Sequence, residues 1–420
     1  MKVIKNSLIY ILVSVFSGAL SFLLLPLLTT YITPKDYGTY EIYRSGLALF
    51  QGFMIFGTNT LIFGNYFKWS KKDLKIFLHN SIFIFLIVSV FFVSMFLLLP
   101  QITNYFYNQY SISLFILLIG VITTLLQSIT SLQTTIFQVN GQAVKYAVFT
   151  AGFSLISFLG TYILVVIYKL NWYSIVISIL FASLIFFSLT IFNFFKLSLR
   201  IRSPLSKIKM ILFLGTPLIF THISGWVIEA VDKIMISSLI DTTATGIYSV
   251  IYKFGLIVFL IQIAVLRAWS AFFFKEKNLN TYKSNLIIVK YTYLLILFLL
   301  LVSILVIIIS PYLFNFFVTD NSYSFSIKIV IYVSIGYFFD GLWKIFNSHL
   351  INLNLTKYYS IILVISASCN LIMNYFFIKM YGIEGAAIST CISFIIGFIL
   401  SLAASLYHSP MPWLYFLKKQ

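Results

Sequence analysis

The stretch LIYILVSVFSGALSFLLLPLLTTYI, residues 8–32, is 25 residues long and has no charged side chain. A helix of about 20 such residues crosses the hydrocarbon core of a bilayer. The stretch is too long for the apolar part of a signal peptide and has no clear small-residue cleavage site, although Lys2 and Lys5 precede it. It therefore predicts a first transmembrane helix that is retained.

The rest of the chain repeats this pattern. Hydrophobic residues make up 61% of the 420 residues and charged residues 9%, whereas a soluble domain carries about 25% charged residues. Lipid is therefore the expected solvent, and the fold class is an all-α integral membrane protein. Apolar runs predict twelve transmembrane helices, near residues 7–31, 44–67, 77–99, 112–136, 146–168, 173–195, 210–231, 246–270, 286–310, 326–349, 357–380 and 384–406.

The net charge of +18 lies mainly in the short loops between these runs. Nineteen Lys and Arg residues fall on one side of the membrane and five on the other, with four at membrane depth. Cytoplasmic loops carry the excess of Lys and Arg, so both termini are expected in the cytoplasm, which requires an even number of spans. This placement disfavours nucleic acid as a partner and favours a multi-pass membrane protein.

The longest basic connection divides the spans into two sets of six. We expect an N-terminal lobe at 1–195, a basic cytoplasmic linker at 196–209, a C-terminal lobe at 210–406 and a cytoplasmic tail at 407–420. Two short similarities relate the lobes, one between residues 38–40 and 246–248 and one between residues 140–146 and 352–358. A parallel repeat of this kind predicts a pseudo-two-fold axis along the membrane normal and a central cavity between the lobes.

Charged side chains inside the spans are the candidate site residues, because each costs roughly 2.5–3.5 kcal/mol at a helix centre on insertion scales. Arg44 and Lys253 stand at nearly the same place in the two halves, six and seven residues after Gly38 and Gly246. Facing each other across a cavity, they would attract an anion, above all a phosphate. The alternative is that each extends to the membrane surface, since both are near a helix start.

The remaining intramembrane charges leave two roles open. Asp340 and Lys344 are spaced i, i+4, as are Glu229 and Lys233, and Asp232 lies beside Lys233. Such pairs neutralise each other on one helix face, or the carboxylates couple transport to protons or sodium ions. Lys344 and Arg267 are further candidates for anion binding, although Arg267, next to Trp269, also fits an interfacial anchor.

Other features bound the function further. Pro26 and Pro217 fall within spans and are expected to bend them. No Walker loop is present, the four histidines are scattered, and Cys369 and Cys391 lie inside apolar runs. We therefore expect no catalytic residues, no metal and no cofactor.

The sequence resembles the bacterial polysaccharide flippases, which export O-antigen and capsule units and belong to the multidrug/oligosaccharidyl-lipid/polysaccharide (MOP) exporter superfamily. The resemblance covers nearly the whole chain in family order. It rests on five stretches: LTTYITPKDYGTY at 28–40, GTPL at 215–218 with VDKIMI at 231–236, GIYSVIYK at 246–253, AWSAFF at 268–273 and YGIEGAA at 381–387.

The resemblance implies two six-helix lobes around a cationic cavity that carries a polyprenyl-pyrophosphate-linked oligosaccharide across the membrane by alternating access. Arg44 and Lys253 match the basic residues that the family has on its second and eighth helices. The Trp-x-Pro often found near the end of the eighth helix is Trp269-Ser270-Ala271 here, without the proline. A polysaccharide polymerase and chain-length proteins are the implied partners, besides membrane lipid.

Three other functions are compatible with a membrane protein of this size. A multidrug antiporter of the same superfamily calls for a carboxylate-lined cavity, because its substrates are usually cationic. A lipid II flippase usually carries fourteen helices. A membrane glycan polymerase or ligase has a sizeable periplasmic loop with charges, whereas the longest outer connections here, 101–111 and 311–325, contain one charge, Asp320.

Overall fold

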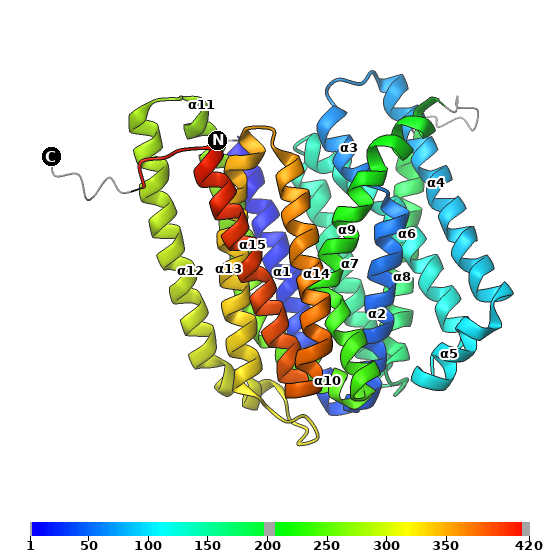
Figure 1. The fold of residues 1–420 in the computed structure, drawn as a ribbon. Coiled ribbons are helices and arrows are strands. Elements are labelled where there is room, and N and C mark those ends of the chain that lie inside the picture. The colour runs from blue at the N-terminus through cyan, green and yellow to red at the C-terminus, as the bar shows by residue number, and fades with distance from the viewer. Residues whose placement is uncertain (1, 197–205, 414–420) are drawn as a thin grey trace. The chain divides into compact units, whose positions relative to one another are not determined.

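The computed structural model describes residues 2–196 and 206–413, and over this part it consists of helices joined by short connections (Figure 1). Most of the expected linker at 196–209, and the tail beyond residue 413, lie outside the described residues. The chain divides into two compact units, residues 1–226 and 227–420. The division falls inside α9 (Ser206–Leu239), and the expected lobe boundaries at 195 and 210 stay a prediction.

The predicted membrane architecture is confirmed. Within the described ranges, eleven helices are long and apolar enough to cross a membrane, and the number is twelve when α2 (Pro34–Ile55) and α3 (Thr58–Asn65), which meet at an angle of 44°, are counted as one broken span. The eighth span is α11 (Ile257–Asn278), and the shorter α10 (Thr242–Gly255) precedes it with only Leu256 between them. The protein is therefore an all-α, multi-pass membrane protein.

Helix α12 (Tyr282–Phe317) shows why lipid must surround the fold. One of its faces exposes Leu294, Leu297, Leu301, Leu305 and Ile308, each by more than half of its surface. Their spacing of three and four residues makes a continuous apolar stripe. A stripe of this size is stable only against hydrocarbon or another apolar surface.

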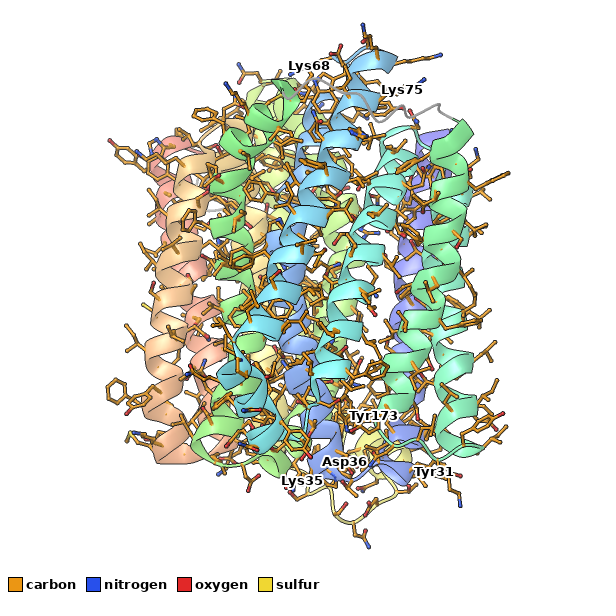
Figure 2. All side chains as sticks on the ribbon, turned by 90° about the vertical axis from the view of Figure 1, so that its right-hand side faces the viewer. Tyr31, Lys35, Asp36, Lys68, Lys75 and Tyr173 are labelled. Carbon is orange, nitrogen blue, oxygen red and sulfur yellow. The ribbon has the colours of Figure 1, made fainter. Side chains whose placement is uncertain are left out.

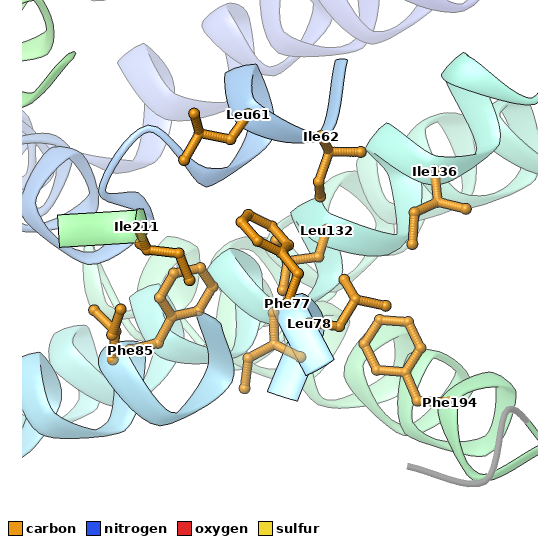
Figure 3. Close-up of a cluster of buried hydrophobic side chains, with 11 residues drawn as sticks. Leu61, Ile62, Phe77, Leu78, Phe85, Leu132, Ile136, Phe194 and Ile211 are labelled. Carbon is orange, nitrogen blue, oxygen red and sulfur yellow. The ribbon is translucent and has the colours of Figure 1, made fainter. Parts of the chain in front are cut away.

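The first unit contains α1 (Lys2–Tyr31), the α2–α3 pair, α4 (Lys71–Leu98), α5 (Pro100–Tyr110), α6 (Leu114–Val139), α7 (Ala143–Val166), α8 (Tyr173–Lys196) and the first part of α9. Helix α6 packs against α2, α4, α7 and α8, while α1 packs on α7. Residues of α3, α4, α6, α8 and α9 form a buried hydrophobic cluster, which includes Ile62, Phe77, Leu132, Phe194 and Ile211 (Figure 3).

Hydrogen bonds show that successive connections of this unit lie at opposite ends of it, as expected for helices that cross a membrane in alternate directions. At one end Asn6 Nδ2 donates to the Gly141 carbonyl over 2.9 Å, and Asn140 Nδ2 donates to the Tyr66 hydroxyl over 2.7 Å. At the other end Asn171 Nδ2 donates to Asp36 Oδ2 over 2.8 Å. In Figure 2, Lys68 and Lys75 accordingly lie at one end, and Lys35, Asp36 and Tyr173 at the opposite end.

The break between α2 and α3 is packed closely against α9. Phe56 and Gly57 both adopt left-handed backbone conformations, with φ of 49° and 66°, which end α2 and turn the chain. Gly215 of α9 approaches this turn so closely that a Cβ there would lie 2.4 Å from the Phe56 carbonyl oxygen. A side chain at Gly57 would meet Leu218 of α9 in turn.

The second unit is built around α13 (Ile327–Asn352), which packs against α10, α11, α12 and α15 (Ile383–His408). Helix α14 (Thr356–Tyr381) completes the unit on α15. Close helix contact depends on small residues: a Cβ at Gly397 would lie 2.4 Å from the Trp343 ring, and one at Gly255 would lie 2.5 Å from Val333. After α15, His349 lies 3.2 Å from the Ser409 hydroxyl, which holds the following segment against α13.

Three features differ from the sequence predictions. The outer connection at 101–111 was expected to be a loop, but it is the helix α5, which starts at Pro100 as its first helical residue. The span predicted at 286–310 ends too early, because α12 continues through Pro311 to Phe317. Helix α2 begins at Pro34, ten residues before the predicted start, because Thr33 caps it by accepting a hydrogen bond from the Asp36 N–H.

Candidate substrate and coupling site

Arg44 of the first unit lies in the third turn of α2 and is held by a carboxylate on the same helix. Its Nε and Nη2 donate to Glu41 Oε2 over 3.1 and 2.8 Å, and the Tyr37 hydroxyl donates to Glu41 Oε1 over 2.9 Å. The Glu41 side chain is 2% exposed, whereas that of Arg44 is 55% exposed. The buried glutamate therefore orients an accessible guanidinium group.

A small cavity of about 40 Å³ borders Arg44. Its walls come from three helices of the first unit, and its lining residues are Tyr40, Tyr43, Arg44, Leu47, Thr123, Val176 and Ile179. Two of the five guanidinium N–H groups are engaged with Glu41, and a guanidinium has the planar geometry that suits a phosphate oxygen pair. The arrangement is chemically suited to an anion, although Glu41 offsets part of its charge.

The second unit carries a buried ion pair where α9 approaches α10. Asp232 is fully buried, and its Oδ2 accepts a hydrogen bond of 2.6 Å from the Tyr248 hydroxyl. Its Oδ1 lies 3.5 Å from Lys233 Nζ, and Lys233 is 4% exposed. Lys233 Nζ also donates to the Glu229 backbone carbonyl over 3.1 Å. Lys233 thus contacts the Glu229 backbone and pairs with the Asp232 carboxylate, and the expected pairing of the Glu229 and Lys233 side chains stays a prediction.

Two tyrosines extend this group toward α13, which carries a second ion pair. Lys233 Nζ lies 5.0 Å from the centre of the Tyr252 ring, and the Tyr252 and Tyr337 hydroxyls are 2.8 Å apart. One turn after Tyr337, Asp340 accepts a hydrogen bond of 2.8 Å from Gln262 of α11 and pairs with Lys344. The expected Asp340–Lys344 pairing is therefore present. We call the seven residues Asp232, Lys233, Tyr248, Tyr252, Tyr337, Asp340 and Lys344 the polar network.

The remaining predicted residues lie at separate places. Lys253 is half-buried in the last turn of α10, and Arg267 is exposed on α11. Glu229 is exposed on α9 one turn before Lys233. Since Arg44 belongs to the first unit and Lys253 to the second, the expectation that they face each other stays a prediction.

The two prolines expected to bend helices lie inside α1 and α9, as predicted for their positions. Around Pro26, the Thr29 and Thr30 hydroxyls donate to the carbonyls of Leu25 and Pro26 over 3.0 and 2.7 Å. Hydroxyls that bond back into the preceding turn are associated with helix bending.

Sequence reasoning missed Glu41, Gln262 and the three network tyrosines. Glu41 was not among the candidate charges because it lies before the predicted start of the second span. A signal was nevertheless present: Tyr37, Glu41 and Arg44 are spaced by four and three residues, so they share one helix face. Tyr248, Tyr252 and Tyr337 were lost among the 28 tyrosines, and no local pattern joins Gln262 to Asp340.

Comparison with known families decides the relationship. The profile of the family described as polysaccharide biosynthesis protein matches residues 3–271, which is more than half of the chain. The chain belongs to this family. A second profile, that of the MatE family, matches residues 217–376. No curated protein matches the chain at a significant level.

Several solved structures share the fold of this chain at low sequence identity. A multidrug resistance MATE family transporter of the MOP superfamily, in an inward-facing conformation, has a TM-score of 0.75 at 12% identity, with 93% of this chain and 96% of that chain covered. The lipid II flippase MurJ, in an inward closed conformation, has a TM-score of 0.73 at 18% identity, with coverages of 96% and 87%. A MOP superfamily transporter from Pyrococcus furiosus has a TM-score of 0.69 at 12% identity, with coverages of 99% and 97%.

The predicted fold class is thus confirmed, and the protein is a multi-pass membrane protein of the polysaccharide biosynthesis protein family.

Proposed function

We propose that the protein is a flippase that moves a polyprenyl-pyrophosphate-linked oligosaccharide repeat unit, of the O-antigen or capsule type, from the cytoplasmic to the periplasmic leaflet. The observation that carries this proposal is the match of residues 3–271 to the polysaccharide biosynthesis protein family. The fold shared with MurJ, a lipid II flippase, is consistent with a lipid-linked cargo. The protein would then act in a bacterial inner membrane with both termini in the cytoplasm.

The charge distribution supports an anionic cargo. A pyrophosphate head group cannot enter hydrocarbon unless cations and hydrogen-bond donors replace its water. Arg44 offers an oriented and accessible guanidinium, and Lys344, with 43% of its side chain exposed, offers an ammonium in the second unit. Lys253 and Arg267 are further cations of the second unit that the pyrophosphate would meet.

Transport requires more than binding, because a tightly held cargo is not moved. In alternating access, one repeat rocks against the other so that a central site opens first to one face and then to the other. The division of the chain into units 1–226 and 227–420 supports such a mechanism. We assign the Asp232–Lys233 and Asp340–Lys344 ion pairs a structural role in the second unit. Asp232, which is fully buried, has a second proposed role as the carboxylate that couples transport to an ion.

The test distinguishes the loss of the Arg44 charge from a destabilised α2. Arg44→Gln alone would leave Glu41 buried and charged, so the informative variants are Glu41→Gln and the double variant Glu41→Gln/Arg44→Gln. In a strain lacking the native gene, we expect Glu41→Gln to retain surface polysaccharide in part. Adding Arg44→Gln, and then Lys253→Gln, should abolish it while the protein remains in the membrane. Normal polysaccharide with the triple variant would refute the assigned anion site.

The lipid-linked intermediate that accumulates in a strain lacking the protein shows whether the protein is a flippase or an enzyme. A flippase defect leaves complete lipid-linked repeat units facing the cytoplasm. A polymerase or ligase defect, the alternative from the enzyme class, leaves single units facing the periplasm. Accumulation on the cytoplasmic face is the expected result, and a polysaccharide polymerase and chain-length proteins would act on the exported units.

A multidrug transporter is the second candidate, and the MatE match over residues 217–376 favours it. Its cationic substrates would bind at carboxylates, and the candidates in the second unit are Glu229, which is exposed, and Asp340, which is paired with the half-exposed Lys344. Drug-resistance assays in a strain lacking its own exporters distinguish the two candidates. Resistance to cationic drugs that is lost in Asp340→Asn, with normal surface polysaccharide in a deletion strain, would favour the drug transporter.

A further inference from the structure

The first unit has a second pocket, at its lysine-rich end and away from Arg44. Its volume is about 460 Å³, and it lies among the ends of α3, α4, α6, α7 and α8. Lys68 and Lys75 lie at this end of the unit (Figure 2), which the loop charge assigns to the cytoplasm. The polar groups that line the pocket are those of Tyr66, Gln133, Asn140, Gln142, Lys145 and Asn193.

These groups define the chemistry of a ligand. Four of the six are amides, one is a phenol and one is an ammonium, and the lining contains no carboxylate. An ammonium without a neighbouring carboxylate favours an anion. Amides and a phenol both donate and accept hydrogen bonds, so they suit hydroxyl groups beside that anion.

Gln133 gives independent support for a ligand. The residue is 5% exposed, and its Oε1 is buried without a hydrogen-bond partner in the described part of the chain. A buried acceptor in this state costs free energy unless a donor reaches it. Nearby, Asn140 already donates to the Tyr66 hydroxyl, which keeps its own proton to donate. The pocket therefore offers an acceptor for a ligand hydroxyl as well as donors for a phosphate.

The apolar side of the pocket faces lipid. Val144 and Val148 of α7 line it and are 65% and 58% exposed. Phe137 and Phe149, whose ring centres are 5.3 Å apart, form another wall. Ile136, a third wall residue, also belongs to the buried cluster of Figure 3, against which Tyr66 and Leu74 pack. The Tyr66 side of the pocket is thus packed against the buried cluster, and its Val144 and Val148 side opens onto an exposed apolar surface.

We propose that this pocket binds the head group of an anionic phospholipid of the bilayer, one that has free hydroxyls, such as phosphatidylglycerol. The phosphate contacts Lys145, a head-group hydroxyl donates to Gln133 Oε1, and the acyl chains lie along Val144 and Val148. A volume of about 460 Å³ is near the lower end for small-ligand pockets, which fits a glycerol head group and not an oligosaccharide of several sugars. The site is separate from Arg44 and does not depend on the proposed cargo.

Native mass spectrometry of the delipidated full-length protein tests the proposal. The added lipids are phosphatidylglycerol, phosphatidic acid and phosphatidylcholine, all with the same acyl chains. Lys145→Gln should weaken phosphatidylglycerol binding about fivefold, since one Lys near an anionic lipid contributes about that factor. Lys145→Arg should bind as the unchanged protein does. Lys68→Gln, which removes the same charge at the same end outside the pocket, should bind within about twofold of it.

The Gln133→Leu variant distinguishes a head-group contact from a collapsed pocket. It should weaken phosphatidylglycerol binding and leave phosphatidic acid binding unchanged, because phosphatidic acid has no glycerol hydroxyl to donate. Equal losses in Lys145→Gln and Lys68→Gln, or equal binding of phosphatidylcholine and phosphatidylglycerol, would overturn the proposal. Displacement of phosphatidylglycerol by a polyprenyl-pyrophosphate oligosaccharide, in the unchanged protein only, would overturn it too and would assign the pocket to the cargo.

Discussion

Glu41 and Arg44 form one ion pair, yet the two side chains are very differently exposed, at 2% and 55%. Removing one partner therefore does not have the same consequence as removing the other. A buried charge that loses its partner stays in a medium of low dielectric, whereas a half-exposed charge can turn to solvent. This asymmetry makes the pair accessible to a double-mutant cycle.

We predict that Arg44→Gln lowers the free energy of unfolding by about 3 kcal/mol, because the Glu41 carboxylate remains buried and loses the cation that pairs with it. Glu41→Gln should lower it by about 1 kcal/mol. The double variant should resemble Glu41→Gln more than Arg44→Gln. Melting temperatures in detergent measure the three variants, and a double variant that is less stable than both single ones would contradict the assigned geometry.

A second residue-scale prediction concerns the Asp232 carboxylate. Tyr248→Phe removes the hydroxyl that donates to Asp232 Oδ2 over 2.6 Å and leaves a fully buried carboxylate oxygen without that donor. We expect a loss of about 1–3 kcal/mol in unfolding free energy. Tyr375→Phe is the matched control, because Tyr375 is exposed on α14, and it should change little. Equal thermal stability of Tyr248→Phe and Tyr375→Phe would contradict the network.

The site residues that could be predicted from the sequence are those with a charged side chain inside an apolar span. Asp340 and Lys344 pair as their spacing indicates, because both lie on one helix and the spacing is a local property. Gln262, which also bonds Asp340, is 78 residues away. Its role depends on how α11 packs on α13, and no local pattern encodes that packing.

At the scale of elements, the turn between α2 and α3 depends on the absence of a side chain on α9. We predict that Gly215→Ala destabilises the first unit, because its Cβ would lie 2.4 Å from the Phe56 carbonyl and backbone must shift to admit it. Gly225→Ala on the same helix meets nothing within 4 Å. It should be neutral or raise stability by up to about 1 kcal/mol, since alanine has the higher helix propensity.

The paired glycine variants are compared by thermal unfolding in detergent and by protein level in the membrane. The comparison holds helix identity and substitution constant, so the difference reports the contact between α9 and the turn. Similar behaviour of Gly215→Ala and Gly225→Ala would show that α9 does not approach Phe56 as closely as described.

Helices whose existence follows from hydropathy were predictable from the sequence. Helices and helix ends that depend on a capping hydrogen bond or on an amphipathic pattern were not. The twelve spans follow from apolar length, and the structure contains them. The helix α5 was missed because its residues are mixed, with Tyr105 and Tyr107 exposed and Tyr110 buried, a pattern that a hydropathy count does not register. The early start of α2 depends on the Thr33 cap, a local hydrogen bond.

At the scale of the whole molecule, the distribution of lysines predicts which face each connection occupies. Lys35 and Lys68 lie at opposite ends of the first unit (Figure 2). In a variant without Cys369 and Cys391, we expect Lys35→Cys to react with an impermeant maleimide from the periplasm. Lys68→Cys should react only after the inner membrane is opened. Labelling in the reverse order would invert the assigned topology.

Helix α9 belongs to both compact units, since residues 206–226 fall in the first and the remainder in the second. The sequence repeat places the boundary between the halves after the sixth span. The packing places it between residues 226 and 227, inside the next helix. A polypeptide that ends at residue 200 would therefore lack a structural part of its own unit, including Gly215 and Ile211, which belongs to the buried cluster. The missing part is carried by the other fragment.

Fragments 1–200 and 201–420 should accordingly be stable when they are produced together and should restore surface polysaccharide, whereas fragment 1–200 alone should be degraded. Protein levels in the membrane measure this, and full accumulation of fragment 1–200 by itself would contradict it. The two halves of the gene are thus complementary pieces and not two self-sufficient modules.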